Sequence, residues 1–311
     1  MQNPTENLIP YHVPALLSEA IDLLNIKPKG IYVDATFGGG GHSRAILEKL
    51  GPEGKLFAFD RDIDSYSNIM EDPRFTFVHS NFRFIENFMR FHGVGKIDGV
   101  LADFGVSFHH FDTPERGFSF RYDSVLDMRM NRSSARNAAE VVNNASEKDL
   151  TEILRNYADL KKTTGVVKAL IEARKVNKIS TTKELMDVVK PALDPRQEKK
   201  ELSQVFQALR IAVNHEDEDI KHFLNSVLKV LKVGGRLVTL TYHSMEDRLV
   251  KNFMKTGNID GIEEKDFFGH VNTPWKLLVR RPIEPSREEI ERNPRSRSAR
   301  LRGAELVEKE S

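Results

Sequence analysis

The chain has 311 residues, enough for one large domain or two ordinary ones, and its formal net charge is +1. This balance excludes a global electrostatic attraction to nucleic acid, so any basic contact surface has to be local. The absence of cysteine excludes disulfides, cysteine-based metal sites and a thiolate nucleophile, and we expect no metal centre. No apolar run approaches the ~20 residues of a membrane span, and the N-terminus lacks a signal sequence. We therefore expect a cytoplasmic protein without a membrane partner.

The first third of the chain alternates short apolar strands with helical segments. Strands are expected over residues 31–34, 55–60, 75–79 and 98–103, and an amphipathic helix over residues 15–24 precedes them. Four strand–helix units in a row predict an α/β fold with a doubly wound sheet, whose ligands bind at the carboxyl ends of the strands. The residues at or just past such ends are Asp34, Asp60, Phe82 and Asp103.

A run of four glycines over residues 38–41 follows the first strand and leads into a helix. Such a turn lets backbone N–H groups approach a bound nucleotide closely. The spacing departs from the dehydrogenase fingerprint, because Ser43 stands where the third glycine belongs. Asp34, four residues before the first glycine of a G-x-G, is instead typical of S-adenosylmethionine-dependent methyltransferases, whose ligand is cationic. The alternatives are a tight turn without a ligand and, with a poorer fit, an NAD-dependent dehydrogenase.

Two further residues have roles suggested by their positions. Asp60 lies about 20 residues beyond the glycines, where an acid can accept hydrogen bonds from ribose hydroxyls. Phe82 could stack on an adenine ring or pack in the core. Because the chain has no cysteine, a methyltransferase of this composition would act on a nitrogen or an oxygen rather than on carbon 5 of a pyrimidine.

A long helical region interrupts the predicted sheet. About 130 residues separate Asp103 from the next convincing strand, over residues 236–242, far more than a crossover needs. Helical periodicity covers residues 138–145, 147–157, 164–174, 182–189 and 202–213, with capping boxes at Ser146 and Thr181. We therefore expect a sheet domain formed by residues 1–110 and 206–311, with an inserted all-α domain over residues 111–205.

Two stretches have the composition of RNA contacts. Over residues 117–130 aromatic residues alternate with arginines, a combination that can hold a flipped base by stacking and cation–π contact. The alternative is an ordinary loop packed on the inserted helices. The arginine-rich stretch over residues 292–302 suits phosphate contacts, although arginine runs are also common on solvated ends. The candidates are Phe118, Phe120, Arg121, Arg129, Arg295, Arg297 and Arg300.

Nearly the whole chain resembles the bacterial small-subunit ribosomal RNA (cytosine-N4)-methyltransferases. The matching stretches are residues 11–14, 34–43, 59–62, 103–107, 116–120, 126–130, 206–211, 243–248 and 293–299. The resemblance implies a class I, Rossmann-like fold and transfer of a methyl group from S-adenosylmethionine to N4 of a cytidine. The implied partner is 16S rRNA, at the decoding centre of the small ribosomal subunit. A homodimer is left open, and the alternative function is a non-catalytic RNA-binding assembly factor with a vestigial cofactor pocket.

The resemblance also assigns site residues. The implied cofactor contacts are Gly40, Gly41, His42, Asp60, Phe82, Asp103 and His110. At position 110 the family usually has glutamine, within Ser-Ser-Pro-Gln, whereas residues 107–110 of this chain read Ser-Phe-His-His. Asp103 is also the candidate catalytic residue, because an acceptor near the N4 hydrogens would help to localise the nitrogen lone pair.

Overall fold

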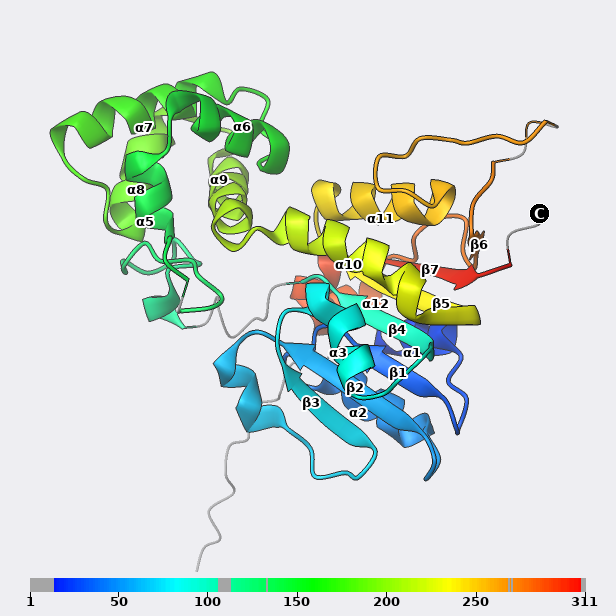
Figure 1. Ribbon diagram of the computed structural model, residues 1–311. Helices are drawn as coiled ribbons and strands as arrows, with labels where there is room; N and C mark the ends of the chain where they lie inside the picture. Colours follow the sequence, from blue (N-terminus) through cyan, green and yellow to red (C-terminus); the bar gives the residue numbers. More distant parts are fainter. Residues whose placement is uncertain (1–13, 106–112, 133, 268, 270, 309–311) are drawn as a thin grey trace, which may run out of the picture. The chain divides into compact units, whose positions relative to one another are not determined.

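The computed structural model describes residues 14–105, 113–132, 134–267, 269 and 271–308. The chain forms two compact units (Figure 1): a sheet unit of residues 1–105 and 222–311, and a helical unit of residues 106–221. The helical unit is thus longer than the expected insertion over residues 111–205. It is longer because helix α9 (Glu198–Asn214) continues past residue 205 and buries Phe206 and Leu209 in the helical core.

The sheet unit is built on one seven-stranded sheet, in the order β3-β2-β1-β4-β5-β7-β6. The strands are β1 (Ile31–Asp34), β2 (Lys55–Asp60), β3 (Phe75–His79), β4 (Ile97–Asp103), β5 (Leu231–Thr241), β6 (Trp275–Leu277) and β7 (Arg300–Leu306). Strands β1 to β5 pair in parallel, and β7 pairs antiparallel with both β5 and β6. The predicted doubly wound α/β sheet is confirmed. Its strand order reverses between β1 and β4, the point where such sheets bind their ligands.

Helices cover both faces of this sheet. They are α1 (Leu17–Leu24), α2 (Gly41–Lys49), α3 (Ile85–Phe91), α11 (Ser244–Thr256) and α12 (Arg287–Arg292). α10 (Glu216–Val230) contains the boundary between the two units. On one face, α1 and α2 pack on a cluster that includes Tyr32, Leu56 and Leu240. On the other face, Phe88 of α3 makes an edge contact with Phe59 of β2, with ring centroids 5.7 Å apart. Both faces of the central strands are therefore buried, as their apolar sequences require.

The arginine-rich stretch near the end of the chain is structured. Residues 294–298 form the 3-10 helix η5 (Pro294–Ser298), and β7 follows inside the sheet between β5 and β6.

Strand β5 is longer than the sequence predicted. It begins at Leu231, five residues before the expected strand at 236. Its register against β4 shifts between the pairs Ile97–Leu231 and Gly99–Arg236, so an irregular segment carries the early residues.

The helical unit matches the predicted helices closely. It contains α5 (Ala138–Asn144), α6 (Glu147–Tyr157), α7 (Thr164–Val176), α8 (Thr182–Val189) and α9. The predicted capping boxes at Ser146 and Thr181 are present, and Asn137 forms a third with Glu140. Among the described residues, no helix combines the length and the apolar character that crossing a bilayer requires.

Candidate active site

The glycine turn between β1 and α2 is fastened by Asp34. This side chain is fully buried, and its two oxygens accept hydrogen bonds from the Ser43 hydroxyl at 2.6 Å and the Thr36 N–H at 3.1 Å. Burial raises the pKa of Asp34, while the neighbouring His42, the Ser43 hydroxyl and the Thr36 N–H act to lower it. Asp34 therefore ties the end of the strand to the first turn of the helix and stays out of solvent.

Two of the glycines are required by local geometry. Gly40 has φ of +75°, and a Cβ there would lie 3.0 Å from the ring of Phe37. A Cβ on Gly41 would collide with the side chain of Pro14. At Gly38, in contrast, a Cβ would meet nothing within 4 Å among the described atoms. The open space beside the turn is thus at Gly38, and a side chain at Gly40 would first strike Phe37.

Asp60 holds the same turn from the end of β2. It accepts the N–H of Gly38 through Oδ2 and the N–H of Asp62 through Oδ1, both at 2.8 Å. Burial raises the pKa of Asp60, and these two backbone donors act to lower it. A carboxylate oxygen has two lone pairs, so each of these oxygens can accept a further hydrogen bond, such as one from a ribose hydroxyl.

Asp103 is the last residue of β4, which lies next to β1 at the point where the strand order reverses. Its Oδ1 accepts the Gly105 N–H at 3.0 Å and its Oδ2 lies 3.3 Å from the Tyr242 hydroxyl, while its own N–H donates to the Thr36 hydroxyl at 2.7 Å. Burial raises the pKa of Asp103 to about 6, although both donors act to lower it. The carboxyl group is therefore ionised at neutral pH and titrates close to it.

The remaining predicted cofactor residues are Phe82, His42 and His110, and they differ in burial and in the contacts they make. Phe82 is half-buried and contacts two aromatic rings edge-on, Phe104 at 5.8 Å and Phe223 at 5.3 Å between centroids. His42 is buried, and its Nε2 has no hydrogen-bond partner among the described residues. His110 lies outside the described residues.

These residues fit a cationic cofactor that carries a ribose. The carboxylates of Asp60 and Asp103 suit hydroxyl and positively charged groups, and the unpaired Nε2 of His42 is the kind of polar atom that a ligand would satisfy. The glycine turn leads into the N-terminal end of α2, where backbone N–H groups lack acceptors within the helix. Such donors suit a carboxylate group.

The sequence of the chain matches the MraW methylase family over residues 10–307. The chain belongs to this family. A protein of Parabacteroides distasonis named ribosomal RNA small subunit methyltransferase H is 55% identical over 298 residues, which cover 96% of this chain and 98% of that protein. The protein of the same name in Flavobacterium johnsoniae is 50% identical over 297 residues, with the same shares covered. The observed sheet is the class I, Rossmann-like methyltransferase arrangement that the sequence predicted.

In this member of the family, the two phenylalanines expected to capture a base are withdrawn from solvent. Phe118 is 4% exposed and lies under the guanidinium of Arg116, whose Cζ is 5.9 Å from the ring centroid. Phe120 is half-buried and packs edge-on against Phe206 of α9, at 5.3 Å. Arg121 is exposed. For the two phenylalanines these positions favour the alternative interpretation, a loop packed on the helices.

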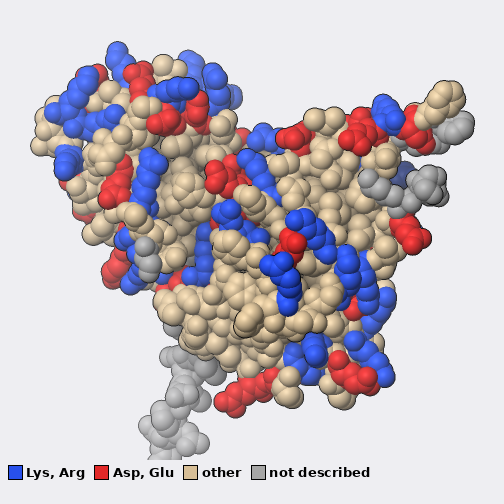
Figure 2. All heavy atoms as spheres, viewed as in Figure 1, with Lys and Arg blue, Asp and Glu red and all other residues tan. Residues whose placement is uncertain are grey.

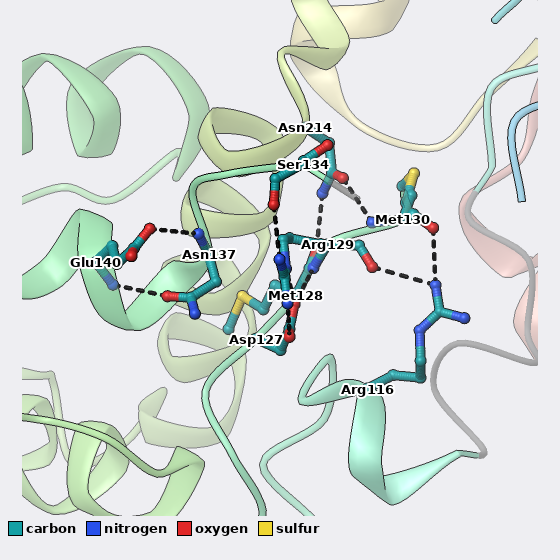
Figure 3. Close-up of polar contacts among 9 residues, drawn as sticks. All are labelled: Arg116, Asp127, Met128, Arg129, Met130, Ser134, Asn137, Glu140 and Asn214. Atoms are coloured by element: carbon teal, nitrogen blue, oxygen red, sulfur yellow. Dashed lines mark hydrogen bonds and ion pairs between the residues drawn. The ribbon is translucent and has the colours of Figure 1, made fainter. Parts of the chain in front are cut away.

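Arg129 belongs to a segment with a strained backbone (Figure 3). It forms a two-pronged ion pair with Asp127, at 2.8 and 2.7 Å, and donates to the Ser134 carbonyl at 2.6 Å. Met128, between these two residues, has φ of +61° although its side chain is fully buried. A left-handed residue that is not glycine costs free energy, so the surrounding contacts have to hold it there.

Two side chains supply these contacts by binding the backbone of the segment. Asn214 of α9 donates to the Met128 carbonyl and accepts the Met130 N–H, both at 2.8 Å. Buried Arg116 donates to the carbonyls of Arg129 and Met130, at 3.1 and 3.0 Å. Neither Arg116 nor Asn214 was predicted as a site residue; the only signal was that Arg116 lies in, and Asn214 close to, a stretch that resembles the family.

The arginines near the end of the chain divide into anchored and exposed side chains. Arg300 and Arg302 of β7 both bind Asp247 of α11, at 3.2 Å for Arg300 Nη1 and 2.8 Å for Arg302 Nε. Arg297 is exposed, Arg295 is half-buried, and Arg300 keeps 47% of its side chain exposed. Arg300 thus joins a strand to a helix within the sheet unit, besides any contact with RNA.

Proposed function

We propose that this MraW methylase transfers a methyl group from S-adenosylmethionine to the exocyclic N4 amine of a cytidine in 16S rRNA, at the decoding centre. The observation that carries the proposal is the likeness, at 50 to 55% identity and over nearly the full length of both chains, to proteins named ribosomal RNA small subunit methyltransferase H. The carboxylates at the switch point provide the chemistry that such a reaction needs. A cytoplasmic location follows from the rRNA substrate, and a homodimer stays a separate prediction.

The cofactor would be held by the edge of the sheet formed by β1, β2 and β4. The residues that we assign to it are Gly40, Gly41, His42, Asp60, Phe82, Asp103 and His110. S-adenosylmethionine, when bound, supplies a methyl group that is already activated by the sulfonium. The protein therefore has to align donor and acceptor and to exclude water, with little covalent chemistry of its own.

Asp103 would act on the acceptor. The lone pair of cytosine N4 is delocalised into the ring, which makes the amine a poor nucleophile. A carboxylate that accepts a hydrogen bond from this amine favours the charge that develops on nitrogen as the new bond forms. With a pKa of about 6, Asp103 is ionised at neutral pH and can accept that hydrogen bond, and later a proton.

Of the residues predicted to contact RNA, the more exposed arginines would bind phosphates, and the others would position the loop over residues 117–130. Arg121 and Arg297 are exposed and suit phosphate contacts, with Arg295 and Arg300 beside Arg297 in the sheet unit. Arg129 binds Asp127, Phe118 is buried beside Arg116, and Phe120 packs on Phe206. We therefore assign to these three residues the positioning of the loop rather than direct stacking on a base. Over the face that Figure 2 shows, basic and acidic side chains alternate on the helical unit, so phosphate contacts have to be local.

The test is reconstitution. Small ribosomal subunits from cells that lack the gene are incubated with the purified protein and S-adenosylmethionine carrying a labelled methyl group. We expect label to approach one methyl per subunit, and the Asp103→Asn variant to bind the cofactor without transferring label. The runner-up, an assembly factor with a vestigial pocket, instead predicts RNA binding with no label transferred and no heat of cofactor binding in calorimetry.

A further inference from the structure

Tyr242 is the residue that faces Asp103 from the neighbouring strand. It follows directly after β5, and its hydroxyl lies 3.3 Å from Asp103 Oδ2. Burial, together with the charge of Asp103, raises the pKa of Tyr242 well above its usual value, so the phenol stays protonated and acts as the donor. No feature of the sequence predicted a role for this tyrosine.

Three features hold the tyrosine in that position. Its backbone N–H donates to Glu246 Oε2 at 2.8 Å, and this glutamate is only 1% exposed. Glu246 is fixed in turn at the start of α11 by His243, whose Nε2 lies 2.7 Å from its Oε1. On the other side, the tyrosine ring packs on Gly105, where a Cβ would approach Tyr242 Cε2 to 2.6 Å. Gly105 therefore has to lack a side chain for the phenol to reach Asp103.

The carboxylates around Asp103 and Tyr242 raise the pKa values of both groups. Glu246 of α11 raises the pKa of Asp103, and Glu246 and Glu289 of α12 both raise that of Tyr242. Asp34 at the end of β1 lies close enough for its own pKa to be raised by the charge of Asp103 and lowered by that of His42. Hydrogen bonds from Gly105 and Tyr242 oppose this accumulation of negative charge at Asp103.

We propose that Tyr242 is a positioning residue for methyl transfer: its hydroxyl, which donates to Asp103 Oδ2, keeps the Asp103 carboxylate in the ionised form that accepts the hydrogen bond of the substrate amine. This inference rests on the proposed role of Asp103. In this proposal Tyr242 acts on the reaction through Asp103.

The test is the pH profile of single-turnover methylation by Tyr242→Phe between pH 5.5 and 8.5. Loss of one hydrogen bond to a carboxylate should raise the midpoint of the acid limb from about 6 by about one pH unit. The rate at pH 6 should then fall about fivefold, and the rate at pH 8.5 should match the parent. Tyr32→Phe is the matched control, because it removes another buried hydroxyl of the sheet unit, bonded to the Lys27 N–H, and should leave the midpoint unchanged.

Two further variants keep the outcome decisive. Gly105→Ala should push the ring away from Asp103 and shift the midpoint in the same direction, even if Tyr242→Phe folds poorly. Adding Tyr242→Phe to Asp103→Asn should change the rate no further. A rate lowered equally at every pH, or a further loss in the double variant, would overturn the role of Tyr242. If Asp103→Asn is itself fully active, the proposed role of Asp103 fails and the inference about Tyr242 fails with it; label transfer by that variant identifies this case.

Discussion

Two sites, the strand ends at the switch point of the sheet unit and the segment around Met128 in the helical unit, bind backbone groups with side chains of opposite charge. In the sheet unit, Asp60 and Asp103 accept backbone N–H groups at strand ends, and their oxygens keep capacity for further hydrogen bonds. In the helical unit, Arg116 and Arg129 donate to backbone carbonyls and to Asp127, and their donors serve the fold. We therefore propose that the chemistry takes place at the edge of the sheet, whereas Arg116 and Arg129 hold the backbone of the helical unit.

The largest effect should come from Asp103. We expect Asp103→Asn to lower the single-turnover methylation rate by a factor on the order of 10² or more, because an amide cannot take up the developing charge. Cofactor affinity, measured by calorimetry, should fall far less. Asp98→Asn is the matched control, since Asp98 is a buried acid near the other end of the same strand, bonded to the Ile31 N–H. Equal losses of rate in the two folded variants would remove the special role of the switch-point carboxylate.

The glycine turn should be nearly as sensitive. Gly40→Val should weaken cofactor binding at least tenfold, because φ of +75° disfavours valine and the side chain would displace Phe37 from the turn. Gly95→Val serves as control: a Cβ there meets no described atom within 4 Å, and its φ is not in the left-handed region. Unaltered cofactor affinity in Gly40→Val would show that the turn does not form the site.

The strained segment of the helical unit should show a separate, smaller effect. Asn214→Ala removes the two hydrogen bonds that hold Met128 and Met130, so we expect a loss of roughly 1–3 kcal/mol in stability and a lower rate on small subunits. Asn143→Ala is the matched control, because it removes a comparable pair of hydrogen bonds to the backbone of Ile179 in the same unit. If both variants lower methylation in proportion to their loss of stability, the segment has no role beyond folding.

The smallest effect should come from the arginines near the end of the chain. Replacing Arg295, Arg297 and Arg300 with glutamine should flatten the salt dependence of RNA binding by up to about 0.7 per lost phosphate contact. The same replacement at Arg280, Arg281 and Arg287, which are also exposed, is the control. Identical slopes for the two triple variants would mean that the first set makes no phosphate contacts.

Sequence patterns predicted the fold where local signals and tertiary packing agree. The strands that end at Asp34, Asp60 and Asp103 and the capped helices of the helical unit are confirmed. Short apolar runs mark these strands and a period of 3.6 marks the helices, and clear turns separate them. Strand β7 was missed, although burial alternates over Arg300, Leu301 and Arg302. Arginines at alternate positions of this strand concealed it, since their charge suggested an RNA tail.

The candidate site was predictable only in part. Strand ends and the glycine turn identify which carboxylates meet at the switch point, because parallel strands present their carboxyl ends at one edge. Contacts between residues far apart in sequence carry no such signal. Tyr242 lies 139 residues from Asp103, and Asn214 lies 86 residues from Met128. The burial of Phe118 also depends on packing that composition does not reveal.

The central claim concerns where the methyl group goes, and mapping the modified nucleoside tests it most directly. Small subunits lacking the modification are methylated with the purified protein, their 16S rRNA is digested, and the nucleosides and fragments are identified by mass spectrometry. We predict N4-methylcytidine at a single cytidine of the decoding centre, absent when Asp103→Asn replaces the parent. A methyl group on carbon 5, on a ribose or on a different base would contradict the account.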